Sequence, residues 1–96
     1  MDGVSLIAVE RQRQIDVEGY TAEHDAREDG ALALAAACYA TPERYRRLHS
    51  DGIPTLWPWN ISFWRPTPND RVRELVKAGA LIAAEIDRLN RLKMFS

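Results

Sequence analysis

A chain of 96 residues has room for one small domain, near the lower end of the sizes that bury a self-sufficient core. A hydrophobic fraction of 46% is typical of a folded globular protein, and a net charge of −1 argues against the broad positive face that DNA or RNA binding requires. No uncharged apolar run approaches the ~20 residues of a membrane span, and no signal-peptide pattern opens the chain. We expect one cytoplasmic domain over residues 1–96, with neither membrane nor nucleic acid as its partner.

Residues 4–17 predict the first helix. Apolar side chains recur along it at spacings of three and four, together with one arginine: Val4, Ile7, Ala8, Arg11 and Ile15. Arg11 therefore lies on or near the buried face, where it either lines a pocket or rests its aliphatic stem on the core. Gln14 follows Glu10 by four residues, which places the two side by side.

Gly19 ends this helix, and a polar connection follows it. The connection is dense in acids and holds one histidine: Glu23, His24, Asp25, Glu28 and Asp29. Asp25 or Asp29 can cap the next helix, whereas the flanking acids raise the proton affinity of His24. Because residues 10–25 gather so many functional groups, we expect them to supply one wall of a binding site that includes Glu18 and Tyr20.

Residues 30–40 predict a second helix that is apolar nearly all round and therefore central and buried. It contains Cys38, the one cysteine of the chain, which cannot form an intrachain disulfide and has no local histidine partner. We expect a buried thiol. Thr41-Pro42 resembles the start of a further short helix over 42–49, with Arg44, Arg46, Arg47 and His49 exposed.

Residues 53–69 hold four prolines and all three tryptophans, and predict a long irregular loop. Residues 53–56 and 61–64 could each form a short strand. The tryptophans either cover the alanine-rich helices as a hydrophobic lid, or Trp57 and Trp59 offer a stacking surface to a ring-bearing ligand. Both interpretations remain open.

Residues 71–93 predict the longest helix, capped by Asp70 or Asn69. We expect its buried seam to be the apolar stripe Val72, Leu75, Val76, Gly79, Ile82, Ala83, Ile86 and Leu89. Residues 78–80 would press against residues 35–37, and Asp87 would pair with Arg91. Leu81 and Leu92 lie off this stripe and suggest a homo-oligomeric contact. Together the elements predict an all-α bundle of three main helices and a short one.

The acids do not have the spacing of a known metal site, and no phosphate loop or nucleophile elbow is present. A hard cation between Glu18, Asp25 and Glu85 is a weaker interpretation than capping and solvation. We expect no cofactor, no bound metal and no catalytic residue. The cationic and polar side chains Arg11, Gln14, Arg65 and Lys77, with the indole rings, instead suit the phosphate and base of a small nucleotide.

Several stretches resemble a family of small phage and prophage proteins: ERQRQI (10–15), EGYTxEHD (18–25), the alanine-rich run that ends at Ala40, WPW (57–59) and LVKAGALIxAEIxRL (75–89). This resemblance covers most of the chain and implies a phage setting. No reaction is implied by it.

The opening and the last helix are more distantly similar to the all-α MazG-type nucleoside triphosphate pyrophosphohydrolases. Those enzymes hold magnesium with a Glu-Glu-x-x-Glu cluster on one helix and an acidic pair on the next. Residues 30–40 contain no acid here, and Glu85 and Asp87 point to different faces of the last helix. The resemblance therefore implies a nucleotide-sized cleft without the metal chemistry.

Three functions are compatible with these patterns. The first is a phage accessory protein of anti-defence type that sequesters a small nucleotide signal without turnover. The second is a divergent pyrophosphohydrolase that uses Glu18, Glu23, Asp25 and Glu85. The third is an inhibitor of a host defence protein, with the tryptophan loop as its hot spot.

Overall fold

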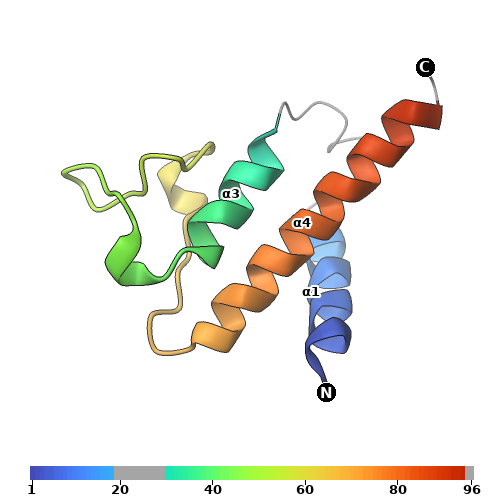
Figure 1. The fold of residues 1–96 in the computed structure, drawn as a ribbon, viewed down its shortest axis with the longest axis horizontal. Coiled ribbons are helices and arrows are strands. Elements are labelled where there is room, and N and C mark those ends of the chain that lie inside the picture. Colours follow the sequence, from blue (N-terminus) through green and yellow to red (C-terminus); the bar gives the residue numbers. More distant parts are fainter. Residues whose placement is uncertain (19–29, 95–96) are drawn as a thin grey trace.

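A computed structural model of the chain describes residues 1–18 and 30–94. Within these ranges lie three α-helices, α1 (Gly3–Glu18), α3 (Ala31–Ala40) and α4 (Arg71–Met94), and two 3₁₀ turns, η1 (Glu43–Tyr45) and η2 (Ile61–Phe63). The described residues contain no strand, so the all-α prediction is confirmed and residues 53–56 and 61–64 do not form strands. Helix α4 contacts both α1 and α3, which lie on different sides of it (Figure 1).

Side-chain caps explain where two of the helices begin. The carboxylate of Asp2 accepts a hydrogen bond of 2.9 Å from the Ser5 amide at the start of α1. Asp70 accepts one of 3.0 Å from the Arg73 amide, as predicted for α4. Gly30 precedes α3 with φ of 77°, a left-handed conformation that suits glycine. The caps expected from residues 25 and 29 lie outside the described residues.

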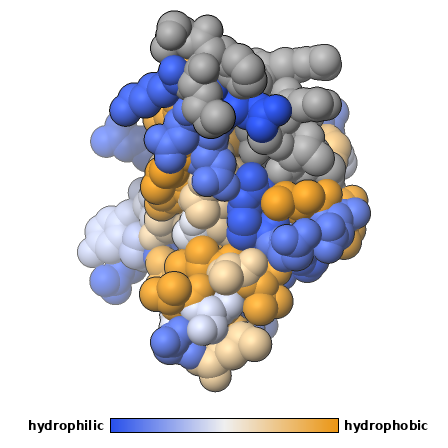
Figure 2. Space-filling model, turned by 90° about the vertical axis from the view of Figure 1, so that its right-hand side faces the viewer, coloured by the Kyte–Doolittle hydropathy of each residue, from blue (hydrophilic) through white to orange (hydrophobic). Residues whose placement is uncertain are grey.

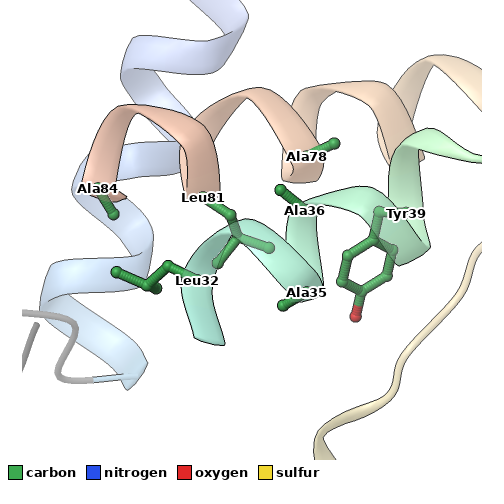
Figure 3. Close-up of a cluster of buried hydrophobic side chains, with 7 residues drawn as sticks. All are labelled: Leu32, Ala35, Ala36, Tyr39, Ala78, Leu81 and Ala84. Carbon is green, nitrogen blue, oxygen red and sulfur yellow. The ribbon is translucent and has the colours of Figure 1, made fainter. Parts of the chain in front are cut away.

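The hydrophobic core forms where α3 crosses α4 (Figure 3). Its buried members are mostly small, which lets the two backbones approach closely: Leu32, Ala35, Ala36, Tyr39, Ala78, Leu81 and Ala84. Leu81 is only 2% exposed and points into this core. The expectation that Leu81 belongs to an oligomer contact was therefore wrong, because α3 covers it.

The predicted apolar seam of α4 was also wrong in large part. Five of its members are between 47% and 61% exposed: Val72, Leu75, Ile82, Ile86 and Leu89. Gly79 of the same stripe packs against α1, since a Cβ atom added there would lie 2.5 Å from Cδ1 of Ile7. Helices α3 and α1 cover the other two faces of α4. Figure 2 views the molecule from the right-hand side of Figure 1 and shows hydrophobic side chains at the surface there.

The predicted helix over 42–49 reduces to the single turn η1. Thr41 ends α3 instead of starting a helix, and its hydroxyl donates to the Ala37 carbonyl over 2.6 Å. The chain then reverses, with an isolated antiparallel bridge between Leu48 and Pro54. Because the segment has no apolar stripe of its own to bury, a longer helix would gain nothing from packing.

Arg46 was expected at the surface, but its side chain is almost fully buried against the end of α3. Its guanidinium donates to the carbonyl oxygens of Cys38 and Tyr39 over 2.9 and 3.3 Å. Arg71 donates to the carbonyls of Tyr39 and Ala40. Two arginines thus satisfy the carbonyl groups that a helix end leaves without partners.

Glu74 joins these two arginines. Its carboxylate lies 3.1 Å from Arg46 and 3.3 Å from Arg71, and accepts a hydrogen bond from the Thr67 amide. Glu74 itself is 2% exposed. This buried ion cluster ties the end of α3, the loop and the first turn of α4 together.

Cys38 is buried, as predicted, and burial raises the pKa of its thiol despite the opposing charge of Arg46. Across the described residues, no helix is both long and apolar enough to cross a membrane.

Candidate functional site

A cavity of about 450 Å³ opens between α1, α4, the end of α3 and the tryptophan loop. One part of its lining is aromatic or aliphatic and the other is charged or polar. The described residues that line it are Glu10, Arg13, Gln14, Val17, Tyr39, Trp57, Trp59, Phe63, Arg65, Arg73, Lys77 and Leu81.

The aromatic wall is held in place from its centre by Trp57. The Trp57 ring meets Tyr39 and Trp59 edge to face, at centroid distances of 5.7 and 5.5 Å. Its indole nitrogen donates to the Asn60 carbonyl over 3.1 Å. Trp57, Trp59 and Trp64 all pack partly buried against the core. The loop is therefore a lid, as one interpretation held, and two of its indole rings also line the cavity.

Tyr39 ties this lid to α3. Its hydroxyl donates to the Phe63 carbonyl and accepts from the Arg65 amide, over 3.5 and 3.1 Å. Lys77 of α4 donates to the Arg65 carbonyl over 2.7 Å and lies 5.4 Å above the Tyr39 ring. Lys77 thus links the charged part of the cavity lining to the aromatic part.

A buried carboxylate, Glu10, organises the charged wall. The guanidinium of Arg13 donates two hydrogen bonds of 2.8 Å to this carboxylate, and that of Arg73, on α4, donates one of 2.7 Å. Gln14 donates to the same carboxylate over 3.2 Å, which confirms the predicted neighbourhood of Glu10 and Gln14. Glu10 is 2% exposed, whereas the side chains of Arg13 and Arg73 keep 37% and 35% of their surface in contact with solvent.

Burial alone would raise the pKa of Glu10. The hydrogen bonds and charges of Arg13 and Arg73 outweigh burial and lower this pKa below the ordinary value of 4.5. Glu10 is therefore a fixed negative charge that orients two guanidinium groups at the cavity.

This lowered pKa predicts a specific loss of stability in acid. The stability that Glu10 contributes is present above pH 4.5 and is lost as the pH falls through its lower folded-state pKa. We expect the free energy of unfolding of the wild type to exceed that of Glu10→Gln by an amount that shrinks below pH 4.5. Urea unfolding of both proteins at a series of pH values measures it. A difference that stays constant with pH would contradict this assignment.

Gln14 lies beside Glu10 and carries one buried polar atom that the described residues leave unsatisfied. Its amide oxygen Oε1 has no hydrogen-bond donor among them, while its Nε2 donates to Glu10. Because a buried acceptor without a donor is costly, a donor supplied from the cavity would stabilise the site.

The structure brings five of the nine predicted site residues to this cavity: Gln14, Trp57, Trp59, Arg65 and Lys77. Arg11 is not among the residues that line this cavity; its side chain is largely buried and lies 3.6 Å from Asp87 of α4. Tyr20 and His24 lie outside the described residues, and the side chain of Glu18 is likewise not described.

Sequence reasoning missed Arg13, Arg73, Tyr39 and Phe63, and treated Glu10 only as a neighbour of Gln14. The spacing of three between Glu10 and Arg13 could have indicated their pairing. Arg73 meets Glu10 from 63 positions away, and no local pattern signals that contact.

Among the described residues, no group of three or more His, Cys, Asp or Glu side chains lies close enough to hold a metal ion. Glu85, one member of the cation site considered above, pairs with Arg88. Asp25 lies outside the described residues.

Comparisons of the chain with protein-family models, with curated proteins and with solved structures found no match.

Proposed function

We propose that this protein binds a small nucleotide in the cavity between α1, α4 and the tryptophan loop. The phosphate groups lie against the charged wall, and the base lies against the indole rings. In biological terms we propose a phage accessory protein of anti-defence type, which sequesters a nucleotide signal without turning it over.

The observation that carries the proposal is the charge balance of the described lining. The described lining contains four cationic side chains, Arg13, Arg65, Arg73 and Lys77, and one carboxylate, Glu10. The described lining therefore has an excess of three positive charges, in a chain whose net charge is −1. Guanidinium groups match phosphate oxygens, and the adjacent aromatic surface matches a base.

Binding without turnover is supported by the state of Glu10. A general base or a magnesium ligand needs lone pairs that substrate or metal can reach. The carboxylate of Glu10 is instead held by two arginines and a glutamine. It organises the cations and makes no direct contribution to chemistry.

The test is titration calorimetry with a panel of mononucleotides, cyclic dinucleotides and ADP-ribose-type nucleotides. At least one should bind, more weakly as salt rises. Arg65→Ala should weaken that binding by about 10-fold or more, since a hydrogen bond to a charged group contributes about 1.5–3 kcal/mol. Arg44→Ala removes an equal charge from an arginine that does not line this cavity and should leave affinity unchanged.

Two outcomes would favour the other functions. Release of pyrophosphate from a nucleoside triphosphate, lost on Glu23→Ala or Asp25→Ala, would indicate the pyrophosphohydrolase. A blank titration with every nucleotide, together with co-purification of a host defence complex, would indicate the protein inhibitor. Either result contradicts sequestration of a nucleotide.

A further inference from the structure

The exposed apolar stripe on α4 follows a heptad rhythm. Its exposed members are Val72, Leu75, Ile82, Ile86 and Leu89, at spacings of three, seven, four and three residues, while Gly79 between them packs against Ile7 of α1. At about 1.5 Å per residue this stripe is about 25 Å long. A helix needs such a stripe on a face that packs against another helix. Helices α1 and α3 already occupy the other two faces of α4.

We propose that this stripe, which we call the α4 seam, pairs with the α4 seam of a second copy of the chain. The two α4 helices run antiparallel about a two-fold axis near residues 79–82. Such an isologous contact requires one self-complementary surface, and a heptad stripe provides it.

Charges at the two ends of the seam favour the antiparallel direction. Asp70 is exposed at the start of α4 and Lys93 at its last turn. Antiparallel pairing brings Lys93 of each copy to the end that carries Asp70 in the other. It also places each helix C-terminus, which is partially negative, beside the partially positive N-terminus of its neighbour.

An apolar depression lies at the C-terminal end of the seam. Ile86, Leu89 and Leu92 line this depression of about 460 Å³ together with Asn90 and Lys93. With the axis near residues 79–82, Leu75 of the second copy falls opposite Ile86. Each copy would then insert a leucine into the hollow of the other, as a knob enters a hole.

Pairing along the seam leaves the nucleotide cavity open. Lys77, which lines the cavity, and Ile82 of the seam are five residues apart, which is about 140° around the helix. Dimer formation and ligand binding therefore use different faces of α4, and each can be tested without the other.

Analytical ultracentrifugation of the wild type should show a particle of twice the 10.9 kDa chain mass. Ile82→Glu would place two carboxylates at the axis and should weaken self-association by at least about 100-fold. Val9→Glu changes an apolar residue of α1 that is 56% exposed, against 48% for Ile82, and this variant should remain dimeric. Circular dichroism checks that both variants stay helical. A monomeric wild type, or a dimeric Ile82→Glu protein, would overturn the proposal.

Disulfide cross-linking tests the direction of pairing. Leu75→Cys and Ile86→Cys should each fail to cross-link alone under oxidation, and an equimolar mixture of the two should give a covalent dimer. The native Cys38 is buried and leaves this readout clear. Cross-linking of either variant with itself would overturn the antiparallel arrangement.

Discussion

Replacing Glu74 by alanine is expected to lower the free energy of unfolding by about 3–5 kcal/mol, the cost of removing one partner from a buried ion pair. Glu74 is 2% exposed and lies within 3.3 Å of both Arg46 and Arg71. Without it, the buried guanidinium of Arg46 loses its only carboxylate partner among the described residues. For a domain of this size the melting temperature should fall by at least about 12 °C.

Glu43→Ala is the matched control. Glu43 is an exposed acid in the η1 turn, and its removal should change the free energy of unfolding by no more than about 0.5 kcal/mol. Thermal and urea unfolding followed by circular dichroism measure both variants. Equal melting temperatures for Glu74→Ala and the wild type would show that the cluster does not hold α3, the loop and α4 together.

Replacing Trp59 by alanine should weaken nucleotide binding by about 10- to 100-fold. Stacking of one base on one aromatic ring contributes about 1–3 kcal/mol, and Trp59 lines the cavity edge to face with Trp57. Trp59→Phe keeps a smaller ring at this position and should recover part of the affinity. Calorimetry with the tightest ligand of the panel gives the values.

Tyr45→Ala is the control for this prediction, because Tyr45 is an aromatic residue that is 64% exposed and does not line this cavity. It should bind like the wild type. A thermal melt of each variant separates a loss of stacking from a loss of folding. If a folded Trp59→Ala protein bound the nucleotide with full affinity, the ring of Trp59 would not contribute to binding, contrary to the proposal.

The positions of the main helices could be predicted from local sequence because their signals are local. Asp70 caps α4 as expected, and the alanine-rich run forms α3 with the small residues at the crossing. The burial of α4 could not be predicted in the same way. Its most hydrophobic stripe is exposed. The buried residues of α4 instead include three alanines and two charged side chains, each of which pairs with another residue: Ala78, Ala80, Ala84, Glu74 and Arg88.

The candidate site was predicted on its aromatic side and only partly on its charged side. Trp57 and Trp59 reach the cavity because prolines keep the loop irregular and their large rings pack on the core. The charged wall depends on Arg73 reaching Glu10 across two helices, which is a tertiary contact without a sequence signal. Arg11 and Arg13 are two positions apart, so they face different sides of α1, and only Arg13 lines the cavity.

The central claim is that the cavity holds a nucleotide and leaves it intact. Native mass spectrometry of the purified protein, before and after incubation with the nucleotide panel, tests this most directly. We predict a retained mass of nucleotide size on each chain, which disappears in Arg65→Ala and persists in Arg44→Ala. A bare protein with every ligand unbound, or ligands returned as monophosphate and pyrophosphate, would contradict the account.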